Sequence, residues 1–234
     1  MIEIIKNHWD DPDSKKIIKK IFMDTKDNPD PKILGQCAKA LAMHGEDIGD
    51  ELLRRYPAAD PQAKLNYAVA LAYLNKKEAI PLLIDDLDKI YNPDLKSSII
   101  KSLGKLSPDD TDTIIALKKV INSASVSRGE KQTIKDATAI EVLSMHAVHA
   151  LSQSHKPQNF HDFVIIASDG SLPVDVRLGA VESLQKSPAD IAPEIIDNLE
   201  GLKKIIQKSE TLDEIDKDRF SRLIRNVEKK LSNK

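Results

Sequence analysis

Hydrophobic and small residues recur every three or four positions along most of this chain, with polar residues between them. In residues 64–90 this spacing produces two successive stripes. The first contains Leu65, Ala68, Leu71 and Ala72, and the second contains Ile80, Leu83, Ile84, Leu87 and Ile90. Residues at this spacing share one face of an α-helix. The pattern predicts two amphipathic helices joined by a tight turn.

A pattern of an apolar residue, any residue, a small residue and leucine occurs five times along the chain. The copies are Ala38–Leu41, Ala68–Leu71, Ile100–Leu103, Val148–Leu151 and Val181–Leu184, which begin 30, 32, 48 and 33 residues apart. Repeats of this length are typical of helical hairpins that stack in an array. One hairpin cannot bury its apolar faces alone, whereas stacked neighbours bury them for each other.

Helix-start signals accompany the repeats. Asp30-Pro31, Asp60-Pro61 and Asn92-Pro93 precede the first three copies. A side-chain oxygen at the N-cap accepts a hydrogen bond from the first turn, and proline at the next position loses none. Ser107-Pro108 and Ser187-Pro188 predict where the second helices begin in two of the hairpins.

Two segments of the chain resemble a known type of helical repeat. They are DVRLGAVESL (Asp175–Leu184), followed by ADIAPEIIDNL, and KLNYAVALAYLNKKEAIPLLIDDL (Lys64–Leu87). They are similar to HEAT repeats, in particular to the short HEAT-like type of phycobilisome lyases. Asp175 and Arg177 match the acid and arginine typical of the first helix of such a repeat. Pro81 and Pro193 match a proline typical of the second helix.

The resemblance implies an all-α fold, a right-handed α-solenoid of about five degenerate hairpins with helical caps. We expect residues 1–234 to form one domain. Its predicted parts are N-terminal cap helices (1–29), three repeats (30–121), a loop insertion (122–136), two repeats (137–208) and a C-terminal cap helix (209–234). A long helix is expected from about Glu130 to Gln153, after the insertion. Insertions in repeat proteins lie at binding faces in some cases, and a tolerated surface loop is the simpler interpretation.

Composition agrees with a helical fold and narrows the function. The chain has 41% hydrophobic and 31% charged residues, so it can bury a core. Only 8 glycines and 4% aromatic residues argue against a β-sandwich or barrel. A net charge of −2 gives the chain as a whole no electrostatic attraction to nucleic acid or anionic lipid.

The sequence also favours a reducing, cytoplasmic location. Cys37 is the sole cysteine, so no disulfide forms within the chain, and we expect it to pack as a small apolar residue. The first residues lack the pattern of a secretory signal, and no apolar run reaches the roughly 18 residues of a membrane helix.

Histidines supply the weak candidates for metal chemistry. His146 and His149 are three residues apart on a predicted helix, and imidazoles at that spacing can bind zinc. No carboxylate or thiol follows at a recognised companion spacing. We therefore expect polar or partly packed histidines, and no metal or cofactor.

Known activities of HEAT-like proteins provide the alternatives. Deoxyhypusine hydroxylase uses His-Glu dipeptides, and this chain has none. HEAT-like DNA glycosylases use a basic groove with several aromatic residues, whereas this chain has one tryptophan and no net positive charge. A bilin-lyase function would rest on the repeat type alone. One basic stretch in the last predicted helix could contact phosphates or acidic proteins, but the solvated side of a capping helix is the favoured interpretation. Its residues are Arg219, Arg222, Arg225, Lys229 and Lys230.

The sequence thus favours a non-enzymatic scaffold that binds a protein or peptide over a nucleic-acid-binding protein or a metal-dependent enzyme. The second helices of stacked hairpins usually line the concave side of the array, so their exposed charges are the candidate contacts. These are Arg54, Arg55, Asp85, Lys89, Lys118, Lys119 and Asp197. The sequence indicates neither the partner's identity nor the oligomeric state.

Overall fold

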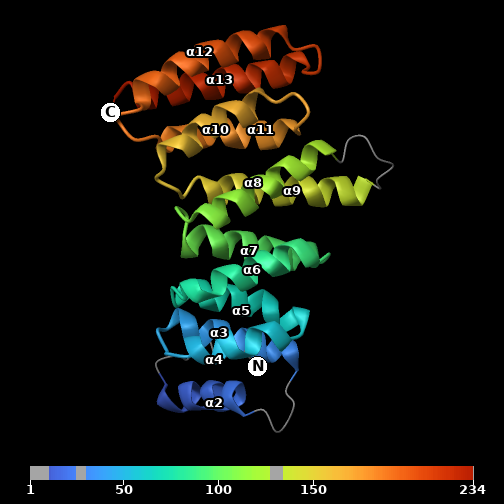
Figure 1. Ribbon diagram of the computed structural model, residues 1–234, viewed down its shortest axis with the longest axis vertical. Helices are drawn as coiled ribbons and strands as arrows, with labels where there is room; N and C mark the ends of the chain where they lie inside the picture. Colours follow the sequence, from blue (N-terminus) through green and yellow to red (C-terminus); the bar gives the residue numbers. More distant parts are fainter. Residues whose placement is uncertain (1–10, 25–29, 127–133, 234) are drawn as a thin grey trace. The chain divides into compact units, whose positions relative to one another are not determined.

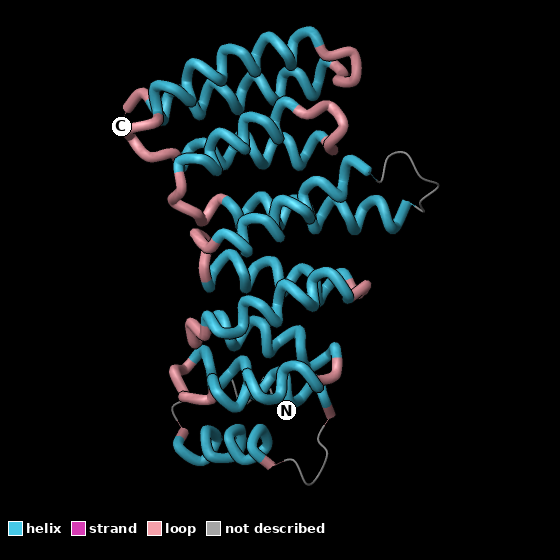
Figure 2. Tube along the Cα trace, in the orientation of Figure 1, coloured by secondary structure: helices cyan, strands magenta, loops and turns pink. Residues whose placement is uncertain are grey.

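The computed structural model describes residues 11–24, 30–126 and 134–233 of the chain (Figure 1). Every regular element in these ranges is a helix, and none is a strand (Figure 2). The predicted all-α class is therefore confirmed. The cap helix predicted within the first ten residues lies outside the described residues, as does the centre of the 122–136 insertion. The stacking of all the hairpins into one right-handed solenoid stays a prediction.

Residues 1–107 form the first of two compact units. Its helices are α2 (Pro12–Met23), α3 (Pro31–Met43), α4 (Gly49–Arg55), α5 (Pro61–Tyr73), α6 (Ile80–Lys89) and α7 (Pro93–Leu106), with short 3-10 turns η1 (Tyr56–Ala58) and η2 (Lys77–Ala79). The helices α2, α3, α5 and α7 pack in succession. The second helices of the hairpins cover this row, α4 on α5 and α6 on α7.

Residues 108–234 form the second unit. Its helices are α8 (Thr111–Val126), α9 (Ile134–Leu151), α10 (Pro157–Ser168), α11 (Val174–Ser183), α12 (Ala192–Lys208) and α13 (Glu214–Leu231), with the 3-10 turn η4 (Leu184–Lys186) after α11. One layer contains α9, α11 and α13, which pack side by side in that order. The other layer packs on it, α8 on α9, α10 on α11 and α12 on α13.

The predicted N-caps of the first unit are confirmed. Asp30 and Asp60 each accept a 2.8 Å hydrogen bond from the backbone N–H two residues on, and Asn92 accepts one of 3.0 Å from Leu95. A proline occupies the first helical position in all three cases. The dipeptides thus fix where α3, α5 and α7 begin.

Two other predicted helix starts are wrong, because α8 and α12 both begin later than predicted. The helix expected at Ser107-Pro108 begins at Thr111, where the Asp110 carboxylate accepts a 2.8 Å hydrogen bond from Thr113 N. Ser187 does not start α12. Its hydroxyl donates to the carbonyl of Leu184 and closes the 3-10 turn that follows α11.

Both ends of the predicted 122–136 loop are helical instead. Residues 122–126 continue α8, and α9 begins at Ile134. Ala124 is buried, one helical turn after the buried Ile121, so it extends the apolar face of α8. The hydroxyls of Ser123 and Ser125 donate to backbone carbonyls three residues earlier, which lets serine remain in the helix.

The five copies of the repeated pattern form the centre of both cores. The first and last residue of every copy is at most 1% exposed, and the small third residue is buried in each. Only the second position varies in burial, and in the last two copies it is the exposed His149 and Glu182. Cys37 is buried as predicted, and burial raises the pKa of its thiol to about 11.

Candidate functional site

Arg54 and Arg55, predicted as exposed contacts, have different surroundings on α4. Arg54 is exposed and pairs with Glu51. The prediction for Arg55 is wrong, because its side chain is only 12% exposed and also pairs with Glu51. The guanidinium of Arg55 donates a 2.5 Å hydrogen bond to the carbonyl of Phe22, and it lies 4.7 Å from the centre of the Phe22 ring. Arg55 therefore holds the C-terminal end of α2.

Four other predicted contacts are exposed, as expected. Asp85 and Lys89 pair with each other at 2.6 Å along α6. Lys119 on α8 and Asp197 on α12 are also exposed. Their role in binding a partner stays a prediction.

Lys118 is half-buried and joins two helices of the second unit. It pairs with Asp162, so it links α8 to α10. The next contact in this layer joins α10 to α12, where His161 Nε2 lies 3.8 Å from Glu194. Polar and charged side chains of this layer thus connect neighbouring helices, and Lys118 is not a free cation.

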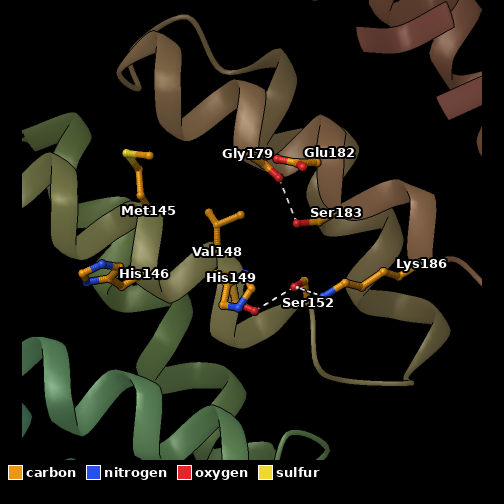
Figure 3. Close-up of a pocket in the computed structure, with 9 residues that line it drawn as sticks. All are labelled: Met145, His146, Val148, His149, Ser152, Gly179, Glu182, Ser183 and Lys186. Carbon is orange, nitrogen blue, oxygen red and sulfur yellow. Dashed lines mark hydrogen bonds between the residues drawn. The ribbon is translucent and has the colours of Figure 1, made fainter. Parts of the chain in front are cut away.

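His146 and His149, the weak metal candidates, both line a pocket beside α9, but their rings point in different directions (Figure 3). Within residues 11–24, 30–126 and 134–233, no group of three or more His, Cys, Asp or Glu side chains could hold a metal ion. This part of the chain therefore offers no complete set of metal ligands.

The pocket has a volume of about 340 Å³ and lies between α9 and α11 (Figure 3). Its lining residues are Met145, His146, Val148, His149, Ser152, Gly179, Glu182, Ser183 and Lys186. Lys186 Nζ donates a 2.9 Å hydrogen bond to Ser152 Oγ, and this hydroxyl donates to the carbonyl of His149 at 2.7 Å. Ser152 Oγ is thus held between an ammonium group and a backbone carbonyl, and no carboxylate or imidazole among the described residues accepts its proton.

A second hollow of about 490 Å³ adjoins the pocket and extends from α11 to α13. It shares Met145, Gly179 and Glu182 with the pocket. Its other lining residues are Asp175, Leu178, Arg219, Arg222, Leu223 and Asn226. We call the two hollows together the α9–α11–α13 groove. Its apolar parts come from Met145, Val148, Leu178 and Leu223, and its other lining residues are polar, charged or glycine.

The arginines at the α13 end of the groove are paired with carboxylates. Arg219 donates to Asp175 at 2.6 Å and to Asp216 at 3.0 Å, and these hydrogen bonds raise the pKa of Arg219. Arg222 pairs with Asp218. Two of the five basic residues predicted on this helix, Arg219 and Arg222, are thus paired with acids.

Gly179 lies in the interior of α11, at the middle of the groove. A Cβ added there would lie 3.7 Å from Val148 Cγ1, an ordinary contact distance, and its φ angle is not positive. Neither close packing nor backbone conformation requires this glycine. Since glycine inside a helix costs about 0.5–1 kcal/mol relative to alanine, the glycine here lowers the stability of α11 without a packing requirement.

Sequence reasoning did not find the groove. The sequence feature that pointed to it most clearly was the second position of the repeated pattern. In the last two copies this position is occupied by His149 and Glu182, which are exposed on the first helices of their hairpins. The prediction had placed the contacts on the second helices instead. Met145, Gly179 and Arg222 come from three different helices. Only the folded chain shows that they meet at one surface.

Comparisons of the chain with protein-family models, with curated proteins and with solved structures found no match. Among the described helices, none combines the length and apolar character needed to cross a bilayer.

Proposed function

We propose that this protein is a non-enzymatic binding module, and that a protein or peptide partner docks in the α9–α11–α13 groove. The observation that supports the proposal is the continuity of the two hollows across three helices around Gly179. A groove with apolar parts and charged residues around them is typical of surfaces that receive a segment of another protein.

The finer architecture is part of the same proposal. The repeat spacing and the buried repeat pattern support HEAT-like hairpins stacked as a right-handed α-solenoid, a fold that commonly presents extended binding surfaces. The single buried thiol of Cys37 is compatible with a cytoplasmic location, which we also propose.

A protein partner is favoured over nucleic acid because the groove contains charges of both signs. Arg219 and Arg222 are paired with carboxylates, and Glu182 would repel a phosphate backbone.

Photo-crosslinking in the native host tests the proposal. A photoreactive amino acid at position 145 samples the groove, and one at position 197 samples the layer of second helices. We expect a discrete crosslinked partner from position 145 that disappears when Gly179→Leu fills the groove and persists in Gly179→Ala. Crosslinks from position 197 alone would assign binding to the other layer, and none from either position would contradict the proposal.

A further inference from the structure

Some of the charged side chains that line the α9–α11–α13 groove form ion pairs with other described residues, and others do not. Arg219 bonds two carboxylates, and one of these is Asp175. Arg222 pairs with Asp218. Glu182, by contrast, makes no hydrogen bond or ion pair with any of the described residues, although it lines both hollows.

Lys186 is the other charged residue of the groove that forms no ion pair with a described residue. It is four residues after Glu182, and this order of acid and base favours an ion pair along an α-helix. The pair does not form, because α11 ends at Ser183 and a 3-10 turn carries Lys186 onward. Lys186 Nζ instead bonds the neutral hydroxyl of Ser152 across the pocket, on the side away from Glu182 (Figure 3).

The charges of Glu182 and Lys186 indicate which side chains of a partner could bind there. A lysine or arginine side chain could lay its aliphatic stem over Gly179, which has no side chain, and against Met145, with its charged end at Glu182. An ammonium group has three donors, and Ser152 takes one from Lys186, so a carboxylate can accept another. A partner with charges of one sign only would be repelled at one of the two positions.

We propose that the partner segment docked in this groove carries a basic side chain that pairs with Glu182 and an acidic side chain that pairs with Lys186. This inference rests on the proposed function, and it specifies the chemistry of the partner. The opposite signs at the two positions also fix the direction in which the segment lies.

Three synthetic amphipathic helical peptides with the same leucine stripe test the charge pattern. The first carries Arg and Glu one turn apart, the second carries alanine at both positions, and the third carries Glu at both. Each is titrated into the full-length ¹⁵N-labelled protein, and the dissociation constant is taken from shifts of groove residues. Because each exposed ion pair contributes about 0.2–1 kcal/mol, we expect the Arg–Glu peptide to bind about 2- to 30-fold more tightly than the alanine peptide.

Two charge reversals show whether Glu182 causes the preference. Glu182→Lys should invert it, so that the Glu–Glu peptide binds more tightly than the Arg–Glu peptide. Glu210→Lys, at an exposed glutamate outside the groove, is the matched control and should leave the preference unchanged.

The remaining outcomes overturn the inference. The inference fails if all three peptides bind the groove equally, or if none of them binds. It also fails if the preference for the Arg–Glu peptide survives Glu182→Lys. Crosslinking from position 145 reports on the proposed function separately. If it still captures a partner, the docking proposal stands without this charge pattern, and if it does not, both fail.

Discussion

Arg177 Nε donates a 2.9 Å hydrogen bond to the carbonyl oxygen of Ala167, in the last turn of α10. The arginine is 2% exposed, and its guanidinium lies 5.1 Å from the centre of the Phe220 ring on α13. One side chain of α11 thus satisfies a carbonyl at the end of the preceding helix and packs against the terminal helix. Arg177 is the residue whose match to the HEAT-like pattern was noted from the sequence.

Replacing Arg177 should strongly destabilise the second unit. Arg177→Ala leaves the Ala167 carbonyl without this donor and opens a cavity beside Phe220, so we expect a loss of about 3 kcal/mol. Urea unfolding followed by circular dichroism measures it. Arg225→Ala, at an exposed position of α13, should change stability by less than about 0.5 kcal/mol. Equal effects of the two substitutions would contradict the structural role of Arg177.

Arg55 and Arg54 form a second matched pair of arginines. Arg55 donates to the carbonyl of Phe22, whereas Arg54 is exposed and pairs with Glu51. Arg55→Ala should release the end of α2 and speed hydrogen exchange of its backbone amides about 5- to 30-fold, for a loss of about 1–2 kcal/mol. Mass spectrometry of exchanged peptides gives this rate. Arg54→Ala should leave α2 protected, and loss of protection in both variants would argue against the contact.

The sequence could predict what depends on local chemistry. The caps at Asp30, Asp60 and Asn92 were predictable because each bonds the first turn of its own helix. Ser107-Pro108 failed because Asp110, two residues further on, caps α8 instead. Arg55 failed for a different reason, since its partner Phe22 lies 33 residues earlier in the chain.

The groove also could not be predicted, because it too depends on contacts between residues far apart in the sequence. It depends on the order in which α9, α11 and α13 pack, and on the 3-10 turn that directs Lys186 to Ser152. Periodicity identifies which face of each helix is buried, but not which exposed residues of separate helices meet.

Glu51 should make stability depend on pH in the acidic range. Hydrogen bonds from Arg54 and then Arg55 lower the pKa of its carboxyl from the usual 4.5 to about 2. Because the folded pKa is lower than the unfolded one, the carboxylate's contribution is complete above pH 4.5 and is lost as pH falls toward about 2. This contribution is about 1 kcal/mol after screening by solvent.

Glu51→Gln should remove that part of the pH dependence. Unfolding free energies at several pH values between the two pKa values would show wild type and variant converging as pH falls. Glu210→Gln, at an exposed glutamate, is the control and should follow wild type. Parallel curves for wild type and Glu51→Gln would show that the arginine contacts do not shift this carboxyl.

Gly35 and Gly179 should respond in opposite ways to the same substitution. A Cβ at Gly35 would lie 3.1 Å from the backbone oxygen of Ala63 and 3.1 Å from Asn66 Cβ, so alanine there requires the backbone of α5 to shift by a few tenths of an ångström. Gly35→Ala should therefore destabilise the first unit by about 1–3 kcal/mol. At Gly179 the nearest atom is 3.7 Å away, so alanine fits and should stabilise α11 by about 0.5–1 kcal/mol. Thermal and urea unfolding of both variants measure whether each substitution lowers or raises the free energy of unfolding. Destabilisation by Gly179→Ala would mean that packing against neighbouring atoms requires the glycine at the middle of the groove.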